Sequence, residues 1–187
     1  AVNATGTSTV LTPSLWRDGV SKSNPEQILL GNGTYAYKVN ATGNENYSDN
    51  STGVTWYARV NKGTLSLSIA GGTTQTYPYQ STVTGTESNG GDSDVTYQLW
   101  RNTSMVDNTD PWSETIYLPA SVWQYRFNST GGANWTANSS GVTTTVTINL
   151  GESAMVVSFT NNNTGYGTPP TAVCNITAGE QTATLTL

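Results

Sequence analysis

Short segments in which apolar and polar residues alternate recur along the whole chain of 187 residues. The clearest is 142–150, where Val142, Val146, Ile148 and Leu150 share one side and threonine or asparagine fills most of the rest. Segment 64–70 repeats the pattern with leucine and isoleucine against serine. Because successive side chains of a strand point to opposite faces, this alternation is typical of antiparallel strands with one buried face.

The same pattern, bounded by Gly, Asn, Pro and Ser, predicts an all-β fold. We expect strands over residues 33–41, 54–61, 64–70, 94–101, 114–118, 121–128, 142–150, 154–160 and 181–187. Pro78 restricts a weaker candidate, 74–86, to an edge or a bulge. Asn24-Pro25-Glu26 predicts one short turn of helix at most. The expected architecture is an antiparallel β-sandwich of the Ig-like or pilin-like kind.

Charge is scarce, with 7 basic and 12 acidic residues. An ordinary soluble domain has about 25% charged residues, whereas this chain has 10%. Serine and threonine together number 52 and asparagine 19, so neutral polar groups must cover the surface. Without a basic cluster we expect no nucleic-acid partner. No apolar run approaches the roughly 18 residues that span a bilayer, so we expect no membrane insertion of the mature chain.

Catalytic equipment is sparse. The chain has no histidine, which removes the commonest general base and metal ligand, and its single cysteine rules out a cysteine-rich zinc site. Carboxylates in 92–94 and 107–110 offer oxygen ligands for calcium, but neither cluster matches a full binding loop. A paired-acid glycosidase, or an acid peptidase using Gln75, Gln80, Gln98 or Gln124, stays formally open without any pair being selected. We therefore expect no enzyme, no cofactor and no metal.

Acceptor sites for N-linked glycans are dense, at eleven Asn-x-Ser/Thr sequons where composition alone predicts about five. Six are followed directly by glycine, which places them at turns, where a glycan has room. A glycan coat would hydrate a surface poor in charge and keep sheet edges apart. The expected glycosylation sites are Asn3, Asn32, Asn40, Asn46, Asn50, Asn102, Asn128, Asn134, Asn138, Asn162 and Asn175.

The chain begins with Ala1, which fits removal of a secretion signal, and we expect a secreted, extracellular protein. Cys174 has no partner for an internal disulfide and is predicted to be a small buried residue. A different hypothesis places an amide bond between Lys38 or Lys62 and an asparagine, since both lysines lie in or beside predicted strands.

Aromatic residues provide the main alternative function. Six tryptophans and ten tyrosines suit a sandwich core, but exposed ones form platforms for sugar rings in binding modules. Trp135 with Trp123, or Trp56 with Tyr57, are the candidates for such a platform. The alternative is therefore a secreted carbohydrate-binding or S-layer-associated β-sandwich module, and an acid-active hydrolase is a weaker one.

Residues 1–12 differ from the head domain expected over 13–187, because they lie ahead of Pro13 and contain no charge. Over residues 2–10, the even positions are small and largely apolar, whereas the odd positions are polar and include the Asn3 sequon. Such a strand suits a groove of another subunit, and it also suits the edge of its own sheet. As a donor strand it would insert Val2, Ala4, Gly6, Ser8 and Val10 into a groove lined by the C-terminal strand with Ala183, Leu185 and Leu187.

With its charge-poor composition, dense sequons and alternating N-terminal strand, the chain resembles the subunit of the archaeal thread, a surface filament of thermoacidophilic archaea. That family is similar in plan to bacterial chaperone-usher pilins, in which an incomplete β-sandwich is completed by the N-terminal strand of a neighbour. The resemblance implies an adhesive or cell-contact homopolymer of identical, glycosylated subunits on the cell surface. The chain lacks the cysteine pair of the bacterial pilins, since Cys174 stands alone.

Overall fold

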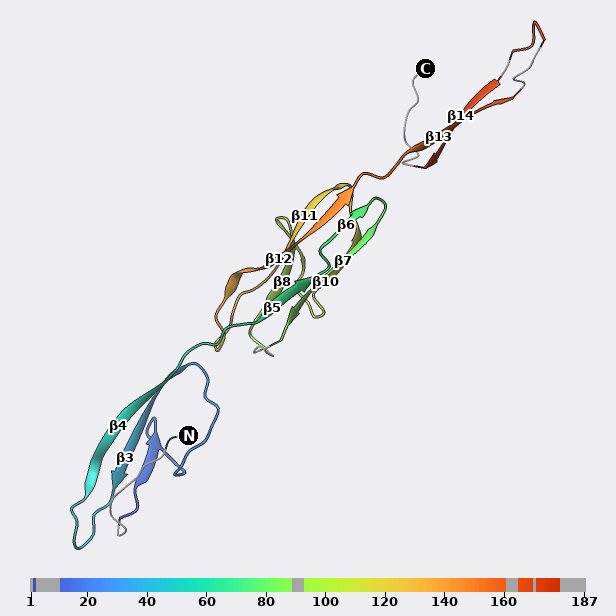
Figure 1. The fold of residues 1–187 in the computed structure, drawn as a ribbon. Helices are drawn as coiled ribbons and strands as arrows, with labels where there is room; N and C mark the ends of the chain where they lie inside the picture. Colours follow the sequence, from blue (N-terminus) through green and yellow to red (C-terminus); the bar gives the residue numbers. More distant parts are fainter. Residues whose placement is uncertain (1, 3–10, 89–92, 161–164, 170, 179–187) are drawn as a thin grey trace. The chain divides into compact units, whose positions relative to one another are not determined.

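The computed structural model describes residue 2 and residues 11–88, 93–160, 165–169 and 171–178. In these residues it contains fourteen strands and no helix, which confirms the predicted all-β fold with mainly antiparallel sheets (Figure 1). The chain forms two compact units. Unit 1 comprises 1–66, 87–96 and 129–140, and unit 2 comprises 67–86, 97–128 and 141–187. The expected head domain, 13–187, thus contains segments of both units.

Unit 1 contains one four-stranded sheet, called the N-terminal sheet below. Its strands lie in the order β2-β1-β3-β4, and all neighbours are antiparallel. Leu15 and Tyr37 are buried on one face, which we call the inner face. The strands are β1 (Ser14–Arg17), β2 (Val20–Lys22), β3 (Gly33–Ala41) and β4 (Asn50–Val60).

Unit 2 contains a β-sandwich of two sheets, ordered β10-β7-β5 and β6-β12-β11-β8-β9. The pair β6 and β12 is parallel, whereas the pairs β8 and β9, and β7 and β10, are antiparallel. The strands are β5 (Leu67–Ala70), β6 (Thr73–Thr76), β7 (Gln80–Glu87), β8 (Tyr97–Arg101), β9 (Ser104–Asp107), β10 (Ser113–Tyr117), β11 (Ser121–Ser129) and β12 (Asn138–Asn149).

The sandwich core lies between these sheets. The Phe127 ring on β11 is fully buried, and its centroid is 5.4 Å from that of Trp112 and 6.0 Å from that of Tyr97. Gly85 of β7 packs on the same ring so closely that a Cβ there would lie 2.5 Å from it. Val83 of β7 is also fully buried, so the smaller sheet is held on the larger one by direct apolar packing.

Two further strands, β13 (Ala154–Thr160) and β14 (Thr171–Ala178), form a two-stranded antiparallel ribbon (Figure 1). We call this ribbon the hairpin. Many of its large apolar side chains are exposed, among them Met155, Val157 and Phe159. Cys174 is exposed as well, contrary to the burial predicted from sequence, because no described residue covers the strand face to which it belongs.

The two units are built on one repeated pattern. The strand order β2-β1-β3-β4 recurs as β9-β8-β11-β12. The sequence Leu-Trp-Arg occurs in the matching strands β1 and β8, at 15–17 and 99–101. Tyr37 and Asn40 recur 88 positions later as Tyr125 and Asn128. Asn-Ser-Thr-Gly-Val-Thr at 50–55 recurs 88 positions later as Asn-Ser-Ser-Gly-Val-Thr at 138–143. The N-terminal sheet is therefore a copy of most of the larger sheet of the sandwich.

Most predicted strands are confirmed, with 33–41 and 154–160 matching β3 and β13 at both ends. Candidate 74–86 becomes two strands, β6 and β7, on either side of Pro78. The predicted helical turn after Asn24 is wrong, because the backbone of Glu26 pairs instead with Val2. Strands β1, β2, β9 and β14 were not predicted. The predicted strand 181–187, with Ala183, Leu185 and Leu187, lies outside the described residues.

Candidate functional site: glycan acceptors and open sheet faces

A glutamate held between an arginine and a tyrosine recurs in the two units. In unit 1, Glu26 lies 3.0 Å from the Arg17 guanidinium and accepts a hydrogen bond of 2.8 Å from the Tyr37 hydroxyl. In unit 2, Glu114 lies 2.6 Å from Arg101 and accepts from Tyr125 at 2.6 Å. Burial, followed by the hydrogen bond to the glutamate, raises the pKa of both tyrosines. Both carboxylates are thus engaged in holding the sheets.

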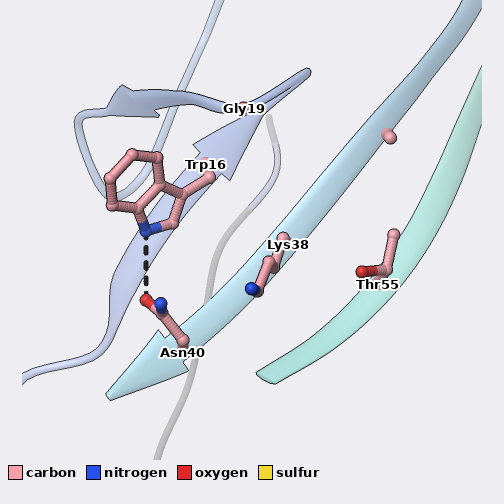
Figure 2. Close-up of a pocket in the computed structure, with 6 residues that line it drawn as sticks. Trp16, Gly19, Lys38, Asn40 and Thr55 are labelled. Carbon is pink, nitrogen blue, oxygen red and sulfur yellow. Dashed lines mark hydrogen bonds between the residues drawn. The ribbon is translucent and has the colours of Figure 1, made fainter. Parts of the chain in front are cut away.

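A second repeated pair joins tryptophan to a sequon asparagine. On the outer face of the N-terminal sheet, the Trp16 indole N–H donates to Asn40 Oδ1 at 3.0 Å, as Figure 2 shows. The pair borders an open hollow of about 420 Å³ that is also lined by Gly19, Lys38 and Thr55. The amide oxygen accepts the hydrogen bond from the indole N–H. The amide nitrogen, to which a glycan is attached, therefore stays available on the side of the hollow. Asn40 is therefore an oriented acceptor.

The equivalent pair in the sandwich is closed. The Trp100 indole N–H donates to Asn128 Oδ1 at 3.2 Å, but Asn128 is only 8% exposed. Lys38 is replaced here by Arg126, whose guanidinium lies over the Trp100 ring at 5.4 Å. A buried amide has no room for a sugar, so the structure does not favour the predicted glycan at Asn128.

The other described sequons are more open. Asn32, Asn46, Asn50, Asn102 and Asn175 are exposed, and Asn134 and Asn138 are half-buried. Two of these amides also organise loops, because Asn134 Oδ1 accepts from the Asn32 backbone and Asn102 Oδ1 accepts from the Gln124 backbone. Asn3 and Asn162 lie outside the described residues.

We expect glycan occupancy to follow this exposure. Site-specific mass spectrometry of peptides from native glycosylated protein should find Asn40, Asn46 and Asn50 modified and Asn128 bare, although both Asn40 and Asn128 lie in equivalent sequons. Equal occupancy at Asn40 and Asn128 would show that the sugar is added before the sandwich closes, and would contradict this prediction.

The candidate metal and acid sites are occupied by local hydrogen bonds. Both carboxylate oxygens of Asp107 accept from the Thr109 and Ser113 backbones, and although burial opposes it, these bonds lower the pKa of Asp107. Asp94 accepts from the Ala133 backbone at 2.6 Å. Within the described residues, no group of three or more Cys, Asp or Glu side chains is placed to hold a metal. Asp92 lies outside them.

The glutamines proposed for acid chemistry are engaged in the sheets where their contacts are defined. Gln75 donates to Thr73 at 3.1 Å, and Gln124 accepts from Thr145 at 3.2 Å. The Lys62 ammonium donates to the Gly132 carbonyl at 2.6 Å, and Lys38 lines the hollow beside Asn40. The amide bond suggested for these lysines stays a prediction.

Of the two aromatic pairs predicted as platforms, Trp56 with Tyr57 does not form a flat one, and Trp123 and Trp135 belong to different units. Trp56 and Tyr57 are 77% and 71% exposed, but as neighbours on β4 they point to opposite faces. Trp123 is held by its indole N–H on the Pro119 carbonyl and by Arg101, 5.5 Å from its ring. Trp135 belongs to unit 1, where it lies against Gly63.

Trp56 instead marks an open region on the inner face of the N-terminal sheet. It is directly opposite Tyr37 in register, and Val54 is opposite Val39. Trp56 and Val54, 58% exposed, are the counterparts of Thr144 and Val142, which are half-buried inside the sandwich. The same sheet face is thus covered in unit 2 and open over β4 in unit 1.

Val2 is the one described residue of the predicted donor strand. Its N–H and C=O exchange hydrogen bonds of 3.0 and 3.1 Å with Glu26 of the same chain. In the sandwich, Glu114 pairs in the same way with Val83 of β7. Val2 therefore occupies the place of β7 within its own unit. Ala4, Gly6, Ser8 and Val10 lie outside the described residues, so their role stays a prediction.

The repeat was not recognised from sequence, although its signal is present. Leu-Trp-Arg occurs twice, and both Tyr-x-x-Asn and Asn-Ser-x-Gly-Val-Thr recur after 88 residues. In a chain rich in Ser, Thr and Asn these matches resemble ordinary turn chemistry. The matches that indicate a repeat are those that contain tryptophan, arginine and tyrosine, because these residues are rarer in this chain than Ser, Thr and Asn.

Comparison with known proteins gives little. No family model matches the chain, and no curated protein matches it. Among solved structures, it is similar to the fibronectin(III)-like modules of CbhA from Clostridium thermocellum, at 10% identity and a TM-score of 0.37, over 79% of this chain and 83% of that one. This likeness is too weak to bear on function. Among the described residues, no helix is long and apolar enough to cross a membrane.

Proposed function

We propose that the chain is the structural, non-catalytic subunit of an extracellular glycosylated filament, whose identical copies join head to tail by completing unfinished β-sandwiches. The observation that carries this proposal is the open inner face of the N-terminal sheet. A sheet of this pattern is covered by a second sheet in the sandwich, whereas Val54 and Trp56 stay exposed in unit 1. Exposed apolar faces of this kind mark surfaces of association.

The distribution of sequons supports the same role. Most exposed sequon asparagines lie at loops or strand ends, as Asn46, Asn50 and Asn102 do, where glycans would hydrate a surface with only 10% charged residues. The carboxylates described above are engaged in hydrogen bonds and ion pairs, which supports a protein without catalysis. Adhesion or cell contact is the corresponding role of such a filament on a cell surface.

Electron microscopy of material sheared from the surface of the producing cells tests the proposal. We expect threads with a regular repeat along their length that are labelled by an antibody against this chain. Purified chain that stays monomeric at every concentration, together with unlabelled or absent threads, would contradict it and favour the secreted binding module.

A further inference from the structure

One face of the hairpin is entirely apolar. The register places Met155, Val157 and Phe159 of β13 opposite Ile176, Cys174 and Ala172 of β14. Met155, Val157 and Phe159 are 62%, 57% and 59% exposed, and Cys174 is exposed too. A two-stranded hairpin is at best marginally stable in water unless such a face is covered. We therefore expect the apolar face of the hairpin to pack against a second sheet.

The sandwich of unit 2 indicates which kind of sheet would cover the hairpin. Leu67 and Ile69 of β5 lie 88 positions before Met155 and Val157, the same spacing that relates the N-terminal sheet to the larger sheet of the sandwich. β5 lies beside β7 in the smaller sheet of the sandwich, as β13 lies beside β14 in the hairpin. β13 thus resembles β5 in sequence, and the hairpin resembles the pair β5 and β7 in the way that its strands are paired. In unit 2 these two strands belong to the sheet that packs on β8, β11 and β12.

The N-terminal sheet is the matching acceptor, because β1, β3 and β4 are copies of β8, β11 and β12. We infer that the hairpin of one chain packs on the inner face of the N-terminal sheet of a second copy, in the places that β5 and β7 hold in the sandwich (Figure 1 labels both elements). This rests on the proposed function, and it assigns the donor to residues 154–160 and 171–178 rather than 2–10.

The chemistry of both faces agrees with this pairing. Neither strand of the hairpin contains a charged residue, and on the inner face of the acceptor Arg17 is already paired with Glu26. The sequon residue Asn175 is opposite Val156, on the other face of the hairpin. On the acceptor, Asn40 lies in the hollow of the outer face. Glycans at both sites would therefore point away from the joint.

The hairpin must compete with Val2, which holds the place of β7 through two backbone hydrogen bonds. β14 offers eight residues to the same place, and β13 adds the missing neighbour. Removing residues 1–12 should therefore strengthen the association, by about tenfold to a hundredfold in dissociation constant for two net hydrogen bonds. A donor strand at 2–10 predicts the opposite, because its removal would abolish association.

Substitutions on opposite faces of single strands provide the test. Val157→Asp on the apolar face of the hairpin and Trp56→Asp on the inner face of the acceptor should each raise the dissociation constant of the full chain at least about a hundredfold, in sedimentation velocity. The matched controls are Val156→Asp and Tyr57→Asp, which change exposed neighbours that point to the other face. Because all four side chains are exposed in the single chain, none of the variants should unfold it.

Cys174 gives an independent readout, since it is the single cysteine and lies in the centre of the apolar face. Its alkylation by a maleimide should be fast in dilute chain, slow in concentrated chain, and fast at all concentrations in Val157→Asp. Association that survives Val157→Asp and Trp56→Asp but is lost on removal of residues 1–12 would overturn the hairpin as donor and leave the filament proposal standing. A monomer with reactive Cys174 at every concentration would overturn both.

Discussion

Replacing Phe127 with alanine is expected to lower the free energy of unfolding of the sandwich by about 3 to 5 kcal/mol. The ring is fully buried, and Tyr97 and Trp112 pack against it. Gly85 lies on the ring without a side chain of its own, so it cannot fill the space that alanine would leave. Denaturant unfolding followed by tryptophan fluorescence measures the change.

Val122→Ala on the same strand is the control. Val122 is 55% exposed and should change the free energy of unfolding by no more than about 0.5 kcal/mol. If Phe127→Ala proves as mild as the control, the two sheets of unit 2 are not held together by this aromatic cluster.

Replacing Glu114 with alanine is expected to destabilise the sandwich by about 3 to 5 kcal/mol, because it leaves a charge and a hydroxyl without their partner. The Arg101 guanidinium lies 2.6 Å from Glu114 with only 21% of its side chain exposed, and the Tyr125 hydroxyl donates to the same carboxylate. Thermal unfolding by circular dichroism, compared with the wild type at one pH, measures the loss.

Two comparisons show whether the network is responsible. Glu152→Ala removes an exposed carboxylate between β12 and β13 and should leave the melting temperature within a degree or two of the wild type. Glu26→Ala breaks the equivalent network of unit 1 and should destabilise that unit instead. If Glu114→Ala leaves the melting temperature unchanged, Arg101 and Tyr125 form hydrogen bonds with water instead. The repeated network would then not be what holds β10 to the larger sheet.

The strands of this chain were predictable where alternation is strong and long. Residues 33–41 and 154–160 match their strands at both ends, since apolar residues at every second position leave little choice of face. β1, β2 and β9 were missed because each is only three or four residues long and carries polar or charged residues. β14 was missed because Asn175 interrupts an otherwise apolar run.

The candidate site was less predictable than the fold. Sequence alone gave every sequon the same weight, and only the fold separates the buried Asn128 from the half-open Asn40. Asn24-Pro25-Glu26 suited the start of a helix, but the pairing of Glu26 with Val2 and Tyr37 depends on residues distant in sequence. Long-range pairing of this kind is what local patterns do not contain.

The parallel pair β6 and β12 bears on how the sandwich would respond to mechanical load. Thr73 to Thr76 lie beside Val146 to Asn149 in the same direction, so tension applied through the chain ahead of β6 and the chain after β12 pulls the two strands lengthwise past one another. Their hydrogen bonds are then loaded together in shear, rather than broken one at a time from an end. A sandwich whose strands are paired in this way yields only at high force, which would suit the load along the filament proposed above.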